Sequence, residues 1–268
     1  MKPRDYLWLG GLLIGATFIW LRDLAWLPFA SDTLPILGAL PLFVWLGAPW
    51  RFQPTRPQPH GVSLAAAGLL LVAGILADFT LLLAAAWSLA LWSWLRGRVS
   101  ETVNLRRLIL LPFMAFPWMT LDMAPVGWWF RVSAAWTTEH LFSVLGFAVV
   151  RQGTNLLVHG LPIEVAPACS GMNSLQAVLI AGIVLALHEF PYHRLYWLSL
   201  ATLPVLAWGA NVLRVCSVVA VALTWGSELA HGWCHDAAGW LILMAIFFCW
   251  WLAIRAGWRW SKTRCACA

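Results

Sequence analysis

Charged side chains are scarce in this chain of 268 residues, where they make up 10% of the sequence, against about a quarter in soluble domains. Hydrophobic residues make up 62%. This composition excludes an ordinary soluble domain and predicts an integral membrane protein. Lysine is almost absent, since Lys2 and Lys262, near the two ends, are the only ones. A lysine Schiff base or a P-loop lysine within the fold is therefore excluded, which makes a nucleotide-driven pump an unsuitable interpretation.

The sequence also lacks internal repeats and low-complexity linkers, so we expect one integral membrane domain over residues 1–268. The first apolar stretch is not followed by the small-residue exit that a signal peptidase requires. We therefore expect this stretch to be retained as a membrane span.

Apolar runs, by contrast, are abundant. A bilayer core of about 30 Å needs about 20 mostly apolar residues per helix, and fewer where flanking side chains reach the interface. The sequence predicts an all-α polytopic membrane protein with about eight transmembrane helices, at Leu7–Leu21, Leu34–Trp50, Val62–Ala77, Thr80–Leu95, Leu108–Leu121, Met172–Leu187, Leu195–Trp225 and Ala237–Ile254.

The basic residues fall mainly in alternate connecting segments, which predicts an orientation. Short loops rich in lysine and arginine stay in the cytoplasm, so we expect both termini inside and the long loop from Asp122 to Gly171 outside. This topology accounts for the net charge of +6, and no nucleic-acid partner is implied. The thirteen residues on the predicted inner side are Lys2, Arg4, Arg51, Arg56, Arg96, Arg98, Arg106, Arg107, Arg194, Arg255, Arg259, Lys262 and Arg264.

The long outer loop divides into two parts. Residues Val126–Val150 interleave aromatic and aliphatic side chains with charges, which is typical of a helix lying on the membrane interface. Residues Val149–Val165 are β-branched and punctuated by glycine, which predicts a small hairpin before the sixth span.

Three polar segments adjoin apolar spans on the predicted outer side. An ionisable side chain at such a place is costly and therefore suggests function. The segments are Glu164–Met172 ahead of the sixth span, Asn211–Arg214 within the seventh, and His231–Gly239 at the start of the eighth. The seventh run is longer than a bilayer core, so Arg214 is expected near the outer boundary, with Val215–Trp225 projecting or bending, aided by Pro204.

Cys169 is expected at a helix N-terminus, where backbone N–H groups and the helix dipole favour a thiolate and can bind an oxyanion. The run Cys169-Ser170-Gly171 equally fits a small buried cysteine packed beside a glycine.

Arg214 shares a helix face with Asn211 and can bind a carboxylate, a thiolate or an oxyanion, but it cannot act as a base. A structural ion pair with Glu228 or Asp236 is the alternative. His235 can shuttle protons near neutrality, oriented by Asp236 or Glu164, or it can be a structural histidine. We predict no metal and no cofactor, although the spacing of His231 and His235 leaves zinc as an alternative.

The three polar segments, in their order along the chain, resemble motifs of the exosortase and archaeosortase family of polytopic membrane cysteine proteases. The resemblance is carried by Glu164–Gly171, by Asn211-x-x-Arg214 and by His235-Asp236-x-x-Gly239-Trp240. It covers roughly Leu108 to Ile254. It divides the chain into N-terminal helices (1–107), an exosortase-like core (108–254) and a basic cytoplasmic tail (255–268).

The resemblance implies an inner-membrane enzyme that cleaves C-terminal sorting signals of exported proteins at the outer face and transfers the new C-terminus. Such a signal has a short motif, often Pro-Glu-Pro, then a transmembrane helix and a basic cluster. The implied partners are these exported proteins, membrane lipids and an exopolysaccharide-linked acceptor. The implied catalytic residues are Cys169, Arg214 and His235, supported by Glu164, Ser170, Gly171, Asn211 and Asp236.

The main alternative is a non-enzymatic transporter or an assembly subunit of an exopolysaccharide system. Such a protein would use Arg214 and His235 to bind an anion or relay protons. A zinc-dependent membrane hydrolase that uses His231 and His235 is the second alternative.

Overall fold

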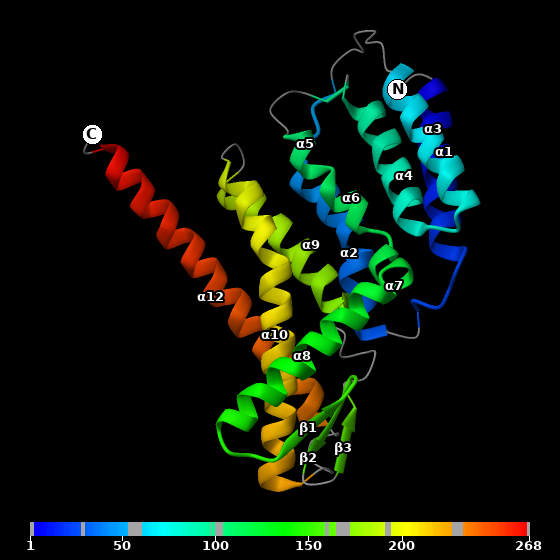
Figure 1. Cartoon of the computed structure of the whole chain (residues 1–268). Coiled ribbons are helices and arrows are strands. Elements are labelled where there is room, and N and C mark those ends of the chain that lie inside the picture. Colours follow the sequence, from blue (N-terminus) through cyan, green and yellow to red (C-terminus); the bar gives the residue numbers. More distant parts are fainter. Residues whose placement is uncertain are drawn as a thin grey trace. The chain divides into compact units, whose positions relative to one another are not determined.

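The computed structural model describes residues 3–27, 30–52, 61–96, 98–99, 104–158, 161–164, 172–190, 194–226 and 233–266. The described part is mostly helical (Figure 1). Its helices are α1 (Pro3–Leu21), α2 (Ala30–Leu46), α3 (Gly61–Leu76), α4 (Thr80–Leu95), α5 (Leu105–Leu108), α6 (Leu110–Met114), α7 (Trp118–Asp122), α8 (Ala124–Val144), α9 (Met172–Glu189), α10 (Leu195–Trp225) and α12 (Trp233–Ala266). Its strands are β1 (Val149–Gln152), β2 (Asn155–Val158) and β3 (Leu161–Glu164).

Several predicted spans coincide with helices, but their lengths differ. Among the described residues, two helical segments are long and apolar enough to cross a membrane, Leu195–Trp225 and Gly239–Gly257. Shorter apolar helices lie at Asp5–Leu21, Pro35–Leu46, Gly61–Leu76, Thr80–Leu95 and Leu175–Glu189.

The predicted fifth span, Leu108–Leu121, is not one helix, and this prediction is wrong. Its residues are divided among α5, α6 and α7. Pro117 precedes α7 and lacks the N–H group that would continue a helix from α6. Hydropathy alone does not register such a break, because every piece remains apolar.

The chain forms two compact units. The first contains Met1–Ala124 and Leu179–Tyr196, and the second contains Pro125–Val178 and Trp197–Ala268. We describe each by itself.

In the first unit, α3 and α4 form a closely packed hairpin. A Cβ atom on Gly74 of α3 would lie 2.8 Å from Cδ2 of Leu83 in α4, so only glycine allows this approach. The turn between them places Asp78 at a positive φ of 53°, and its carboxylate pairs with Arg22 at 2.8 Å. The indole Nε1 of Trp87 donates to the carbonyl of Leu12 at 2.7 Å and thereby ties α4 to α1.

In the second unit, the predicted hairpin is real but is extended by a further strand. The strands form an antiparallel sheet in the order β1-β2-β3. The turn between β1 and β2 uses Gly153 at a φ of +66°, and β3 pairs with β2 in a register that sets Asn155 opposite Glu164. The prediction of two strands was therefore incomplete.

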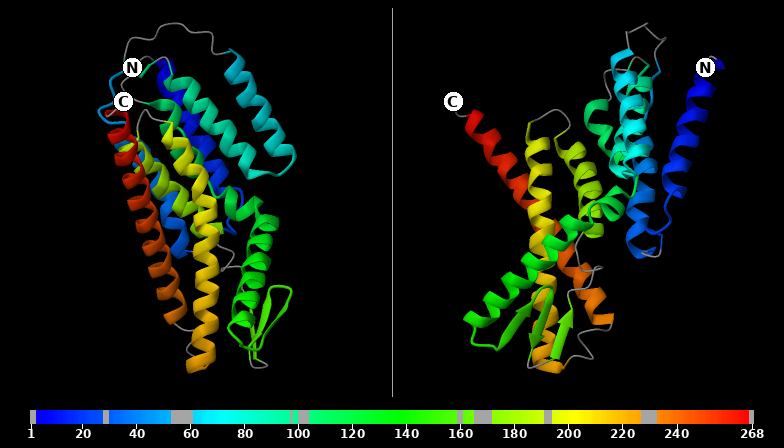
Figure 2. Two further views of the ribbon diagram at one scale, coloured as in Figure 1. Left: turned by 60° about the vertical axis from the view of Figure 1, so that its left-hand side comes forward. Right: turned by 45° about the vertical axis from the view of Figure 1, so that its right-hand side comes forward.

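This sheet packs with α8 and α10 around one hydrophobic core, and both views of Figure 2 show the strands alongside the C-terminal half of α10. At 1.5 Å per residue, the 31 residues of α10 span about 46 Å, more than a hydrocarbon core of about 30 Å. Part of its C-terminal half is buried in this core, and the prediction that Val215–Trp225 projects or bends beyond the bilayer stays a prediction. The buried residues of this core include Ala134, Ala135, Phe142, Val149, Leu156, Val158, Ile163, Val212, Val215, Cys216, Val218 and Val219.

Candidate functional site

The best-defined approach at the predicted site is that of the Arg214 side chain on α10 to the backbone of Gly239 on α12. A Cβ atom on Gly239 would lie 2.7 Å from Nε of Arg214, 3.0 Å from Cζ and 3.1 Å from Cδ. The guanidinium therefore rests against the backbone of α12, at a place that any larger residue would fill. Elsewhere the same helices are joined by a hydrogen bond of 2.9 Å from Nε1 of Trp250 to Oγ1 of Thr202.

Position 235 belongs to the first turn of α12, which begins at Trp233. Residues four apart lie on the same helix face, so position 235 lies one turn from Gly239 on the face that meets Arg214. Two of the three predicted catalytic positions thus lie along one helix pair. The side chains of His235 and Asp236 are outside what the structure describes, and His231 and Glu228 are outside the described residues.

Asn211 lies one turn before Arg214 on α10 and is 4% exposed. Its Nδ2 donor has no hydrogen-bond partner within the described part of the chain. A buried N–H donor without an acceptor is costly and unusual. The side-chain amide of Asn211 can therefore donate a hydrogen bond to an acceptor outside the described residues.

The predicted nucleophile segment lies between β3 and α9. Glu164 is the last residue of β3, and α9 begins at Met172. Cys169, Ser170 and Gly171 are outside the described residues. The chain therefore enters a helix immediately after the Cys-Ser-Gly run, which is the local arrangement on which the thiolate hypothesis rests.

The sequence analysis missed a polar residue on α9. Gln176 is 0% exposed although it carries an amide. It lies in the first turns of α9, four residues after Met172. An amide within an otherwise apolar helix is the signal that would have identified it.

The polar contacts of α8 also hold the site's scaffold together. The indole of Trp208 on α10 donates to Oγ of Ser133 at 2.9 Å, while Oγ1 of Thr138 lies 3.4 Å from Sγ of Cys216. Glu139 accepts a hydrogen bond from the backbone N–H of Arg151 at 2.8 Å and so joins α8 to β1. The first two contacts join α8 to α10, the helix that carries Arg214.

Within the described residues, no group of three or more histidine, cysteine, aspartate or glutamate side chains is arranged to hold a metal ion. Two cysteines in this part of the chain are thiols, the buried Cys216 and the exposed Cys249. Neither adjoins a helix N-terminus in the way predicted for Cys169.

Comparison with known proteins identifies the family. The family described as transmembrane exosortase (Exosortase_EpsH) matches residues 31–252. No curated protein matches the chain, and no solved structure matches it. The match includes all three polar segments and most of the apolar helices. The chain therefore belongs to the transmembrane exosortase family, the membrane enzymes of PEP-CTERM protein sorting.

Proposed function

We propose that this protein is a membrane-embedded cysteine endopeptidase and transpeptidase that cleaves PEP-CTERM-type sorting signals of exported proteins. Cys169 is the nucleophile, His235 the proton carrier and Arg214 the electrostatic stabiliser. Glu164, Ser170, Gly171, Asn211 and Asp236 support them. The substrate is an exported protein whose C-terminal motif precedes a transmembrane helix and a basic cluster.

In this mechanism the Cys169 thiolate attacks the scissile carbonyl carbon and forms a C–S bond. Arg214 stabilises the oxyanion that develops on the carbonyl oxygen. The C–N bond breaks as protonated His235 gives its proton to the leaving amine. A hydroxyl or amine of the acceptor then attacks the thioester, His235 takes its proton, and the thiolate leaves.

The contact between Arg214 and Gly239 is the observation that carries this proposal. It brings a permanently charged guanidinium to the backbone of α12, one turn from position 235. A structural arginine needs only a counter-charge, whereas an oxyanion stabiliser must lie beside the proton carrier. The packing of α10 against α12 supports the role of Arg214 as an oxyanion stabiliser.

We further propose a multi-pass arrangement in the bacterial inner membrane, with both termini cytoplasmic and the site facing the periplasm. The distribution of basic residues supports this topology. Shorter apolar helices such as Thr80–Leu95 cross when flanking side chains reach the interface.

The test is co-expression with a reporter that ends in a Pro-Glu-Pro motif, a transmembrane helix and a basic cluster. Replacement of Cys169 or His235 by alanine is expected to reduce processing about 10³-fold or more. Arg214→Ala is expected to reduce it about 10²- to 10³-fold. Cys249→Ala, at an exposed thiol, serves as the control and should process normally. If Cys169→Ser processes the reporter like the wild type, the protein is a carrier or assembly subunit and the proposal is wrong.

A further inference from the structure

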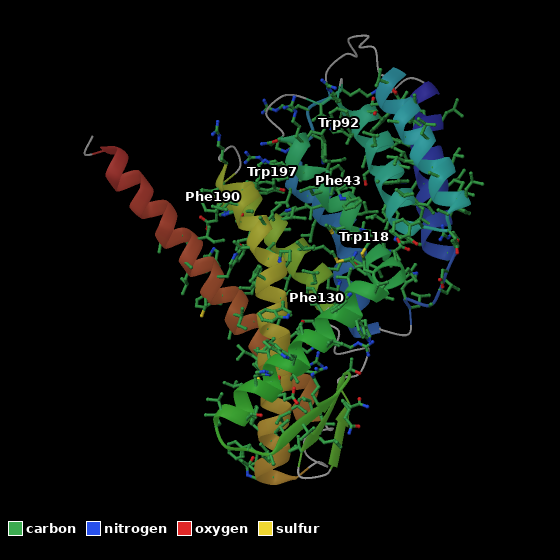
Figure 3. All side chains as sticks on the ribbon, viewed as in Figure 1. Phe43, Trp92, Trp118, Phe130, Phe190 and Trp197 are labelled. Atoms are coloured by element: carbon green, nitrogen blue, oxygen red, sulfur yellow. The ribbon has the colours of Figure 1, made fainter. Side chains whose placement is uncertain are left out.

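A groove in the first unit has no role in the proposed proteolysis. It lies between α4 and the segment formed by α5 and α6, and has a volume of about 500 Å³. Half-buried apolar side chains, including Leu89, Trp92, Leu110 and Phe113, line its body. Trp92, labelled in Figure 3, lies near the C-terminal end of α4.

Arg96 and Arg106 give one end of this groove a positive charge. Both side chains are exposed, and neither forms an ion pair or hydrogen bond with a described residue. Their neighbours differ, because Arg98 pairs with Asp5 at 3.2 Å and Arg107 donates to the carbonyl of Phe190. Among the described residues, no acidic side chain neutralises the two guanidinium groups at the groove.

Ser88 contributes a buried hydroxyl to the groove. The residue is 6% exposed, lines the groove, and its Oγ has no hydrogen-bond partner within the described residues. A buried hydroxyl normally finds a partner. The Oγ atom is itself covered, so a ligand atom in the groove reaches it after the Ser88 side chain rotates to another rotamer.

Along the end of α4, one helical turn separates Arg96 from Trp92, and another separates Trp92 from Ser88. The guanidinium of Arg96 lies over the ring of Trp92, 4.7 Å from its centroid, so its charge is one turn closer to Ser88 than its Cα atom is. Ser88 lies one further turn along, about 5 to 6 Å at the pitch of an α-helix. Along the groove, the charge of Arg96 therefore comes first and the hydroxyl of Ser88 follows, with apolar side chains on either side.

We propose that this groove binds an anionic phospholipid. Arg96 and Arg106 bind the phosphate, Ser88 donates to an ester carbonyl, and an acyl chain lies along Leu89 and Phe113. The charge complementarity of the two arginines selects an anionic headgroup over a zwitterionic one. The predicted orientation places this end of the groove in the cytoplasmic leaflet. The proposal does not depend on Cys169 or on any step of proteolysis.

The test is native mass spectrometry of the full-length protein in detergent, with phosphatidylglycerol and phosphatidylcholine of identical acyl chains as probes. We expect retained phosphatidylglycerol adducts and few phosphatidylcholine adducts. Arg96→Gln and Arg106→Gln should each weaken phosphatidylglycerol binding about fivefold, and Ser88→Ala should weaken it less. Thermal unfolding of each variant shows whether it is folded.

Arg255 provides a matched control, because its guanidinium also lies 4.7 Å from a tryptophan ring centroid, that of Trp251. Arg255→Gln should leave phosphatidylglycerol binding unchanged. The proposal is overturned if Arg255→Gln weakens binding as much as Arg96→Gln does, or if both lipids bind equally. Displacement of the lipid by equimolar glycerol phosphate would also overturn it, because a headgroup site alone would then explain the binding.

Discussion

Gly239 determines where the guanidinium of Arg214 can lie. Alanine favours a helix by about 1 kcal/mol over glycine, so Gly239→Ala should not destabilise α12 itself. The added methyl would displace Arg214, whose Nε lies 2.7 Å from the position it would occupy. We expect reporter processing to fall about 10- to 100-fold at an unchanged Tm.

Gly257 on the same helix is the matched control, since a Cβ atom there meets nothing within 4 Å. Gly257→Ala should process the reporter normally. Equal processing by the two variants would show that the position of Arg214 against α12 does not affect activity.

The buried amide of Asn211 predicts opposite effects on stability and activity. Its Nδ2 has no partner within the described residues, so Asn211→Leu should raise stability by about 1 kcal/mol. Processing should fall at least about tenfold if this N–H serves the substrate or the Cys169 segment. Thermal unfolding and the reporter assay measure the two effects.

Thr80→Val is the control for this experiment, because Oγ1 of Thr80 is also buried without a partner in the described part of the chain. This variant should become more stable and retain its activity. A loss of stability in Asn211→Leu without loss of processing would mean that the amide has only a structural role.

At the scale of elements, α4 depends on a carboxylate from a distant part of the sequence. Asp122 at the end of α7 accepts hydrogen bonds from the backbone N–H groups of Thr80, at 3.1 Å, and Leu81. A carboxylate at a helix N-terminus also interacts favourably with the helix dipole. Asp122→Ala should therefore cost about 1–2 kcal/mol, measured as a lower Tm in detergent.

The control is Asp23→Ala, which removes a carboxylate that accepts an exposed local hydrogen bond from Ala25 at 2.8 Å. It should cost less than about 0.5 kcal/mol. An equal loss in both variants would indicate that the cap contributes nothing beyond a local turn.

The bounds of helices were predicted correctly where hydrophobicity along the chain is the main signal. Thr80–Leu95 and Leu195–Trp225 have the predicted bounds, because uniform hydrophobicity and flanking polar residues are local properties. The break around Pro117 was missed, and the predicted hairpin at Val149–Val165 has three strands, because apolar content decides neither a helix break nor the pairing of a short strand.

The residues of the candidate site could be proposed from the sequence, but their arrangement in space could not. Spacing along the chain places Asn211 and Arg214 on one helix face, and it leaves open which neighbouring helix that face meets. The meeting of Arg214 with Gly239 depends on the packing of α10 against α8 and α12. Local periodicity contains no information about such packing, whereas the amide of Gln176 within an apolar helix was a local signal that the sequence analysis did not use.

At the scale of the whole molecule, the predicted topology requires opposite ends of the second unit to lie on opposite sides of the membrane. Gln152, exposed in β1, should face the periplasm, and Cys265, near the end of α12, should face the cytoplasm. In a chain without other cysteines, a membrane-impermeant thiol reagent should label Gln152→Cys in intact cells. Cys265, retained alone, should be labelled only after permeabilisation.

The opposite labelling pattern would place the basic residues of α12 in the periplasm and would contradict the orientation predicted from charge. The active site would then face the cytoplasm, where an exported protein's sorting signal is not yet translocated. Labelling of both cysteines in intact cells would instead show that α12 does not cross the membrane. At about 51 Å for its 34 residues, α12 is long enough to cross and to carry its basic end beyond the hydrocarbon core.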